Sequence, residues 1–165
     1  MEIGKVMEKS INSQIQAEFE SAYLYLSMAA WFEDEDLPGC AHWMEKQAEE
    51  ELEHGMKFYT YLISRGGSVV LEAIPTPKKD WGSAVEVFEE VLSHERLVTE
   101  LIDKMAELAE KENDRATRSM LNWFIDEQVE EEENAAGILA KFKRAAGKPM
   151  GLMMLDKELG KREED

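Results

Sequence analysis

The stretch "GGSVVLEAIPTPKKDWG", residues 66–82, decides how this chain folds. It contains Gly66, Gly67, Pro75 and Pro77, which are residues that interrupt helices, so we interpret it as an extended linker. About 15 extended residues reach roughly 50 Å, whereas a helix of roughly 27 residues is about 40 Å long. The linker is therefore long enough to run from one end of a helical bundle to the other.

On both sides of the linker, apolar residues recur at spacings of three and four, which predicts α-helices. Four long helices are expected at about residues 5–35, 39–65, 83–112 and 114–146, and a short fifth helix at about 149–160. The connections "DLPG" (36–39) and "END" (112–114) are short, so helices one and two, and helices three and four, should form antiparallel hairpins. The expected fold class is all-α: a four-helix bundle with one long crossover and a short fifth C-terminal helix.

At 165 residues the chain has the size of one domain, so we expect residues 1–165 to form a single domain with a substantial core. Its 36 acidic and 19 basic residues give a formal charge of -17, which disfavours nucleic acid and anionic membranes as partners and favours cations. Cys40 has no partner for an intrachain disulfide, no apolar run is long enough for a bilayer, and no signal sequence follows Met1. We expect a cytoplasmic location.

Each of the four long helices has one apolar arc when residues are placed about 100° apart, and a glutamate interrupts every arc. These glutamates are, in chain order, Glu18, Glu51, Glu95 and Glu131. Close to them lie His54 at the edge of the second arc, and Glu127 and Gln128 beside the fourth. Within "EEELEH" (49–54), Glu49 and Glu53 fall on the opposite side of the helix, and we interpret them as solvated surface.

These inward glutamates require compensation, because an unpaired carboxylate inside a protein costs several kcal/mol and a domain is stable by only about 5 to 15 kcal/mol. No Lys or Arg lies on the four arcs near them, so a bound metal explains them better than buried ion pairs. Carboxylates with one imidazole suit iron or manganese. Glu51 and His54, three residues apart, share one helical face and can bind one ion. The alternative is that the glutamates are ordinary, partly exposed groups at the edge of the core.

Three stretches of the chain are highly specific when taken together: "NSQIQAEFESAYLYLSMA" (12–29), "HWMEKQAEEELEHGMKFYTYLISRGG" (42–67) and "NWFIDEQVEEE" (122–132). With them the chain resembles a prokaryotic (bacterial or archaeal) non-haem ferritin over nearly its whole length. The resemblance implies a ferritin-like fold, with a diiron ferroxidase centre inside the bundle that oxidises Fe(II) with O₂. It also implies iron storage as ferric oxyhydroxide inside a hollow homo-oligomeric shell of 24 subunits.

Carried over residue by residue, the resemblance implies a first iron held by Glu18, Glu51 and His54. Glu51 would bridge to a second iron, whose other neighbours would be Glu95, Glu131 and, close by, Gln128. A third iron site beside the pair, as in bacterial ferritins, would use Glu50, Glu127, Glu130 and the shared Glu131. Tyr25 matches the family's conserved tyrosine beside the centre and would give an electron or a proton, although packing also explains a tyrosine on an apolar arc.

Several positions depart from related proteins. Gln128 and Glu131 stand where symmetric diiron proteins such as bacterioferritin repeat glutamate and histidine. Leu52 stands where bacterioferritin has its haem-binding methionine, so no haem is expected. Arg118 and Leu121 align with two acids that line the three-fold channels of animal ferritins, so that route for iron is not expected here.

Apolar residues away from the arcs bear on assembly. Tyr23, Leu24 and Trp31 lie off the arc of the first helix, which indicates an oligomer. In "MGLMML" (150–155), three methionines are compatible with soft-metal ligation, but packing of a short apolar helix explains them better. In ferritins the fifth helix meets its symmetry mates at the four-fold axis.

Two other function classes compete with an iron-oxidising store. A rubrerythrin-like diiron peroxidase would add a cysteine-rich rubredoxin module, which one cysteine cannot build. A non-catalytic structural or metal-buffering shell would lack the inward ligand set. Oligomer size together with O₂ uptake on addition of Fe(II) separates all three classes.

Overall fold

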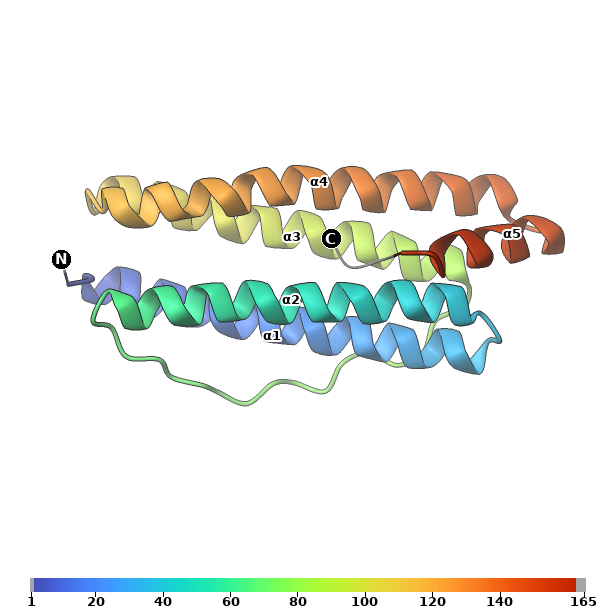
Figure 1. Ribbon diagram of the computed structural model, residues 1–165, viewed down its shortest axis with the longest axis horizontal. Coiled ribbons are helices and arrows are strands. Elements are labelled where there is room, and N and C mark those ends of the chain that lie inside the picture. Colours follow the sequence, from blue (N-terminus) through green and yellow to red (C-terminus); the bar gives the residue numbers. More distant parts are fainter. Residues whose placement is uncertain (1, 163–165) are drawn as a thin grey trace.

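A computed structural model describes residues 2–162, in which four long helices lie side by side and a short fifth helix sits at one end (Figure 1). The helices are α1 (Lys5–Asp34), α2 (Pro38–Ser64), α3 (Ala84–Lys111), α4 (Arg115–Ala145) and α5 (Pro149–Leu159). Every boundary falls within one residue of its predicted position. The predicted all-α class, with one long crossover and a short fifth helix, is confirmed.

The bundle consists of two antiparallel hairpins, as the short connections predicted. α1 packs along α2 and α3 along α4, the two hairpins meet through α1 and α3, and α5 contacts both α2 and α4. Across the part of the chain that the structure describes, no Cα atom of α2 comes within 8 Å of a Cα atom of α4. The contact between α2 and α4 is therefore made by side chains, such as the rings of Phe58 and Phe124, which stack with centroids 4.0 Å apart.

Both hairpin turns are built by residues that tolerate a left-handed backbone. Asp36 has φ 57° and Asn113 has φ 54°, and side chains of this kind adopt that conformation at little cost. Pro38 then begins α2, where its missing N–H is not needed. Asp114 caps α4 by accepting a hydrogen bond from the Thr117 N–H at 3.1 Å.

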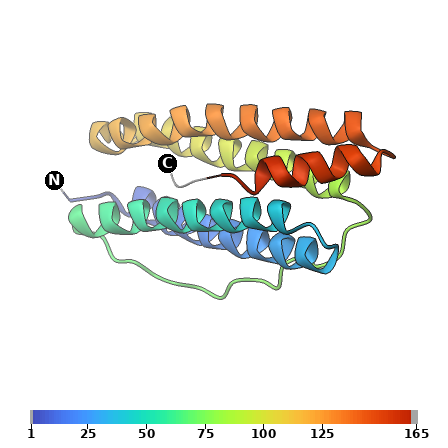
Figure 2. The ribbon, with the colours of Figure 1, turned by 45° about the vertical axis from the view of Figure 1, so that its right-hand side comes forward.

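The linker runs along the outside of the α1–α2 hairpin, as Figures 1 and 2 both show. Polar side chains of α1 hold it in place: Asn12 donates to the Ser68 carbonyl at 2.9 Å and accepts from the Val70 N–H at 2.7 Å. Near the other end, the Ser27 hydroxyl donates to the Lys78 carbonyl at 2.6 Å. These bonds supply partners for an extended backbone that has no sheet to join.

The linker also covers apolar residues that the sequence places outside the core. Trp31 packs edge-on against Trp81 of the linker, with ring centroids 6.0 Å apart, and Leu24 is partly buried against the same core cluster. The prediction that Leu24 and Trp31 are exposed was therefore wrong, because both are partly buried against this cluster, and Trp81 of the linker packs against Trp31. Tyr23 does remain exposed.

α5 docks onto the beginning of α2 through an unusually close backbone approach. The Asp156 carboxylate accepts a hydrogen bond from the Cys40 N–H at 2.9 Å and so caps a helix that lacks a capping side chain of its own. A Cβ added at Gly39 would lie 1.8 Å from the Asp156 carbonyl oxygen, so only glycine fits there. α5 is thus fixed against α2, and residues 160–162 turn back from its end toward the middle of the bundle (Figure 2).

The apolar core is divided into two halves. One half gathers the C-terminal half of α1, the N-terminal halves of α2 and α3 and the C-terminal end of α4, and the other gathers their opposite ends. Between them lies a layer of buried polar side chains, at about the middle of every long helix. Within residues 2–162, no helix combines the length and the apolar character needed to cross a membrane.

Candidate metal centre

The polar layer contains all four glutamates that interrupt the apolar arcs. Glu18, Glu51, Glu95 and Glu131 are 1%, 2%, 0% and 6% exposed, so their predicted inward placement is confirmed. Also buried in this layer are Gln14, Ser21, Gln47, His54 and Gln128. Glu49 and Glu53, by contrast, lie exposed on the outer side of α2, as predicted. The acidic run on α2 is therefore divided between a solvated face and the interior.

Three of these side chains form a compact group with suitable donors for one cation. One ligand atom each from Glu18, Glu51 and His54 lies within 4.8 Å of the others. The Nδ1 of His54 is 3.6 Å from the Oε2 of Glu51. Two oxygens of the group, Oε2 of Glu18 and Oε2 of Glu51, are buried without any hydrogen-bond donor. Because buried carboxylate oxygens are costly without a partner, the donor set fits a divalent cation.

Close packing of α1 on α2 brings these three side chains together. A Cβ added at Gly55 would lie 2.4 Å from the ring of Phe19 and 3.3 Å from the Cβ of Glu18, so glycine lets the two helices approach here. His54 is then flanked edge-on by two rings of α4, Trp123 and Phe124, with centroids 5.4 and 5.9 Å away. Packing against these two rings fixes the orientation of the imidazole, and its Nδ1 lies beside the Glu51 carboxylate.

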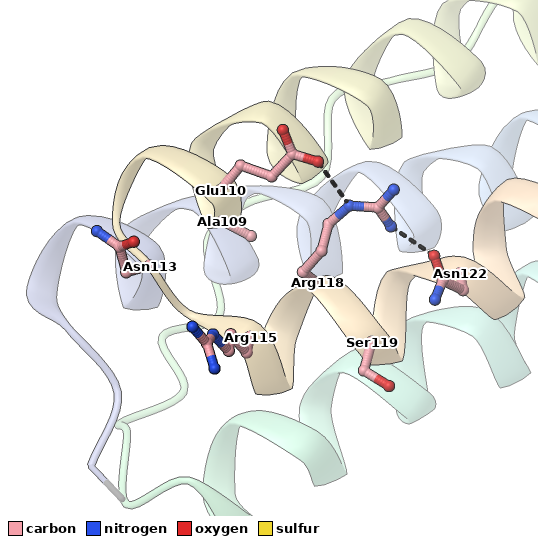
Figure 3. Close-up of a pocket in the computed structure, with 7 residues that line it drawn as sticks. All are labelled: Ala109, Glu110, Asn113, Arg115, Arg118, Ser119 and Asn122. Carbon is pink, nitrogen blue, oxygen red and sulfur yellow. Dashed lines mark hydrogen bonds and ion pairs between the residues drawn. The ribbon is translucent and has the colours of Figure 1, made fainter.

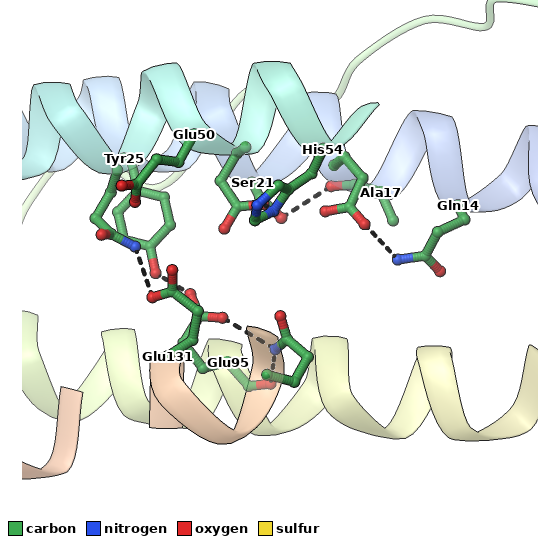
Figure 4. A network of polar contacts seen from close by, with 12 residues as sticks. Gln14, Ala17, Ser21, Tyr25, Glu50, His54, Glu95 and Glu131 are labelled. Carbon is green, nitrogen blue, oxygen red and sulfur yellow. Dashed lines mark hydrogen bonds and ion pairs between the residues drawn. The ribbon is translucent and has the colours of Figure 1, made fainter. Parts of the chain in front are cut away.

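Glu95 and Glu131 come from the other hairpin and face this group across the bundle (Figure 4). Glu95 accepts hydrogen bonds from the Tyr25 hydroxyl and, at 3.3 Å, from the Gln128 amide. Glu131 accepts one from the Gln47 amide at 3.0 Å. In the described part of the chain, neither joins the compact three-residue group. Neutral donors hold the second pair of carboxylates, whereas the first pair has unsatisfied oxygens.

Burial and mutual repulsion in the layer favour carboxyl groups that are either protonated or bound to a metal ion. Burial raises the pKa of Glu18 and of Glu51 well above the usual value, and the charge of a neighbouring carboxylate raises both further. Burial and the charge of Glu95 raise the pKa of Glu131 to about 7. Burial, reinforced by the charge of Glu95, also raises the pKa of Tyr25. The phenol is therefore protonated at neutral pH and is able to donate to Glu95.

The three acids predicted for a peripheral site lie at the edge of this layer. Glu50 is half-buried, and its pKa is raised by burial and, to a smaller extent, by the charge of Glu127. Its carboxylate forms an ion pair with Arg162 at 2.6 Å. Glu127 is also half-buried, whereas Glu130 is exposed to solvent. The structure thus brings Glu50 and Glu127 into electrostatic contact and leaves Glu130 outermost.

Reasoning from the sequence missed three residues of the network. Gln14 donates to Glu18 at 2.9 Å, and Gln47 donates to Glu131. Both precede an inward glutamate by four residues, and that spacing on one helical face is a signal from which they could have been found. Arg162 follows the last helix, so no helical periodicity points to it.

Another surface feature surrounds the turn between α3 and α4, where Arg118 and Asn122 line a shallow depression (Figure 3). Arg118 Nε donates to the Glu110 carboxylate at 3.1 Å. Leu121, the other residue at issue for a three-fold channel, is completely buried. An arginine at the surface and a leucine in the core do not offer a cation the two acids of an animal ferritin channel.

Four buried glutamates and one histidine inside an antiparallel helical bundle define a class of carboxylate-rich bundle proteins, in which Glu18, Glu51 and His54 form a group that could hold a metal ion. Comparison with known proteins narrows this class. The Ferritin-like domain family matches residues 8–145. A bacterial non-heme ferritin of Bacteroides fragilis (strain 638R) is 44% identical over 160 residues, which cover 97% of this chain and 99% of the relative. One from Staphylococcus saprophyticus is 38% identical over 163 residues, covering 99% and 98%. The chain belongs to the ferritin family.

Solved structures agree with this assignment. An open pore ferritin from the hyperthermophilic archaeon Archaeoglobus fulgidus matches with a TM-score of 0.98 and 42% sequence identity, covering 99% of this chain and 100% of that one. A form of the Archaeoglobus fulgidus ferritin engineered to be closed has a TM-score of 0.97, also at 42% identity, and covers 99% of each chain. The fold and the resemblance stated from the motifs are both confirmed.

Proposed function

We propose that this protein is an iron-storage ferritin that oxidises Fe(II) with O₂ inside its helical bundle and stores ferric oxyhydroxide in a hollow shell. The observation that carries the proposal is the pair of buried, unpartnered carboxylate oxygens on Glu18 and Glu51 beside His54. Membership of the ferritin family makes iron the expected cation. The assignment treats residues 1–165 as one domain, although residues 1 and 163–165 lie outside the described part.

The proposed ligands are those that the resemblance to ferritins implies, and the burial of the four inward glutamates and His54 in one polar layer supports them. A first Fe(II) is held by Glu18, Glu51 and His54. A second takes Glu95 and Glu131, with Glu51 as the bridge and Gln128 beside it. A third uses Glu50, Glu127, Glu130 and the shared Glu131 at the periphery. Glu95 now accepts hydrogen bonds from Tyr25 and Gln128, and Glu131 accepts one from Gln47. To bind the second iron, these carboxylates must give up some of those hydrogen bonds.

The chemistry is a two-electron transfer. Anionic oxygen ligands favour the higher charge of Fe(III), so two adjacent Fe(II) ions are both made better reductants by the carboxylates. Each loses one electron, and O₂ takes up the two electrons and two protons to become H₂O₂. Tyr25, whose hydroxyl already donates to Glu95, is placed to supply a proton or a further electron.

The resemblance to ferritins implies a homo-oligomer of 24 subunits, and exposed apolar surfaces support association of subunits. Tyr23, Leu26, Leu52 and Ile74 line a groove along the α1–α2 hairpin, and each is at least 41% exposed. On α5, the methionines of "MGLMML" point outward, because Met150, Met153 and Met154 are 65% to 69% exposed. Surfaces this apolar are typical of subunit contacts. Packing between subunits therefore explains the methionines better than soft-metal ligation does. A cytoplasmic location and the lack of haem remain predictions.

The proposal is tested by adding Fe(II) to the metal-free protein while O₂ and particle mass are measured. We expect a particle of about 450 kDa, which is 24 times the 18.9 kDa of one chain, and O₂ uptake far faster than in buffer. A rubrerythrin-like peroxidase would instead consume added peroxide without storing mineral. A metal-buffering shell would bind Fe(II) without accelerating O₂ uptake, and either result would contradict the proposal.

The peripheral acids are tested through the stoichiometry of the reaction. In Glu130→Ala, the two central ions keep most of their ligands, so rapid oxidation should persist. The number of Fe(II) ions oxidised per O₂ should change, because a third ion supplies an extra electron during turnover. Oxygen consumption and peroxide release after sub-stoichiometric iron measure this ratio. Glu133→Ala, an exposed acid on the same helix, is the matched control and should leave the ratio unaltered. An unchanged ratio in Glu130→Ala would mean that Glu130 is only surface charge.

A further inference from the structure

The C-terminal arginine reaches back over the metal centre. After α5, residues 160–162 turn back toward the side of the bundle formed by α2 and α4, as Figures 1 and 2 show. Arg162 there contacts side chains of α2 that span about two helical turns. Its Nη2 donates to Glu50 at 2.6 Å, its carbonyl lies 2.9 Å from His42 Nε2, and its guanidinium lies 4.9 Å from the centre of the Trp43 ring. These contacts anchor Arg162 on α2.

Arg162 is also connected to a candidate ligand of the central pair. Its Nη1 donates to the Oε1 of Gln47, while the Nε2 of Gln47 donates to the Oε2 of Glu131 at 3.0 Å. Gln47 is almost completely buried, so its amide has little access to solvent as an alternative partner. A single buried side chain, that of Gln47, thus links Arg162 to the polar layer.

The guanidinium takes the position of a cation among the peripheral acids. Glu50 faces the charge of Glu127 as well as those of Arg162 and His54, and Arg162 is the one of these groups that forms an ion pair with it, at 2.6 Å. An arginine keeps its charge at all accessible pH values. A divalent cation at Glu50 would compete for the same carboxylate and would be repelled by the guanidinium at close range.

We propose that Arg162 is a built-in counter-cation, and that a metal ion at the peripheral acids displaces it and releases residues 160–162 from α2. This inference rests on the peripheral cation position proposed above. The body of α5 does not need to move, because Asp156 and the close approach at Gly39 fix it independently of Arg162. Binding of the metal and docking of Arg162 on Glu50 oppose each other, and this coupling is reciprocal. The factor by which bound metal weakens the docking of Arg162 is therefore the factor by which docked Arg162 weakens metal binding.

Zn²⁺, which cannot be oxidised by O₂, provides the test without enzymatic turnover. A nitroxide attached at Lys161→Cys reports motion of the chain end, since Lys161 is exposed. Cys40 does not compete for the label, because it is buried and burial raises the pKa of its thiol. We expect the electron paramagnetic resonance spectrum to narrow when the last equivalents of Zn²⁺, those at the peripheral acids, bind. Calorimetry on the same samples gives the Kd of this binding step.

Arg162→Gln should bind those last equivalents about tenfold more tightly, which is within the usual range of coupling between sites. In that variant the label should already be mobile before Zn²⁺ is added. Lys157→Gln is the matched control: it removes the same charge from the last turn of α5, and its Kd should not change. Zn²⁺ binding that leaves the label unchanged would overturn the proposal, as would weaker binding in Arg162→Gln. A protein that binds no Zn²⁺ at all would instead overturn the metal centre itself.

Discussion

Replacing Glu51 by alanine is expected to abolish rapid Fe(II) oxidation without unfolding the bundle. Glu51 is the proposed bridge and belongs to the compact group with Glu18 and His54, so its loss removes a ligand from both central ions. Mutation of a residue that only hydrogen-bonds to a metal ligand typically lowers metal affinity or activity about 10- to 100-fold. Removal of the bridging ligand itself should therefore lower the oxidation rate by more than about a hundredfold. Stopped-flow measurement of Fe(III) formation gives the rate.

The fold should survive this change because a costly buried charge leaves together with the side chain. Burial and the nearby charge of Glu95 both oppose ionisation of Glu51, so its removal relieves repulsion within the layer. Glu49→Ala and Glu53→Ala are the matched controls, since both acids are exposed on the same helix, and they should oxidise iron at the normal rate. Normal oxidation kinetics in an assembled Glu51→Ala shell would refute the assigned bridge.

The stability of the metal-free protein is expected to fall as the pH rises from about 5 to above 7. The pKa of Glu131 is raised from 4.5 to about 7 in the folded state, so the folded chain binds more protons than the unfolded chain between these values. Stability is therefore greatest below the unfolded value and is lost progressively up to the folded one. For Glu131 alone, the loss in the free energy of unfolding is about 3 kcal/mol.

Calorimetric melting of the chelator-treated protein across this pH range measures the effect. The raised pKa values of Glu18 and Glu51 act in the same direction. Asp114, whose pKa is lowered from 3.8 chiefly by its bond with Arg65, acts only at lower pH, where protonation weakens that pair. In Glu131→Gln the slope between pH 5 and 7 should be reduced. A melting temperature that rises with pH in this range would be inconsistent with raised pKa values.

Bound metal should restore the stability that the metal-free protein loses at neutral pH. Because Zn²⁺ binds the folded carboxylates and requires them deprotonated, it stabilises the protein by mass action, by about 2.7 kcal/mol at a free concentration of 100 times the Kd. The same Zn²⁺ concentration should have much less effect at pH 5, where protons occupy the oxygens. The absence of any shift at saturating Zn²⁺ and neutral pH would argue against a metal site among Glu18, Glu51 and His54.

The local structure of this protein could be predicted closely from its sequence. The positions of the helices follow from apolar spacing and from the turn residues around 36–38 and 113–114, which act over a few residues. The inward position of the four glutamates follows from the same periodicity, because a residue on the apolar arc of a helix faces the core whatever the helix packs against.

The sequence by itself therefore determined the bundle, its long crossover and the four helices' contributions to one buried acidic layer. Only the tertiary structure decided how that layer is connected. It packs Trp31 against Trp81 of the linker, aligns Tyr25 with Glu95 from a different hairpin, and brings Arg162 onto Glu50. Glu50 and Arg162 are 112 residues apart along the chain, and their contact depends on the angle at which α5 docks on α2. Periodicity constrains neighbours within one helix, whereas contacts between distant segments are set by how whole helices pack.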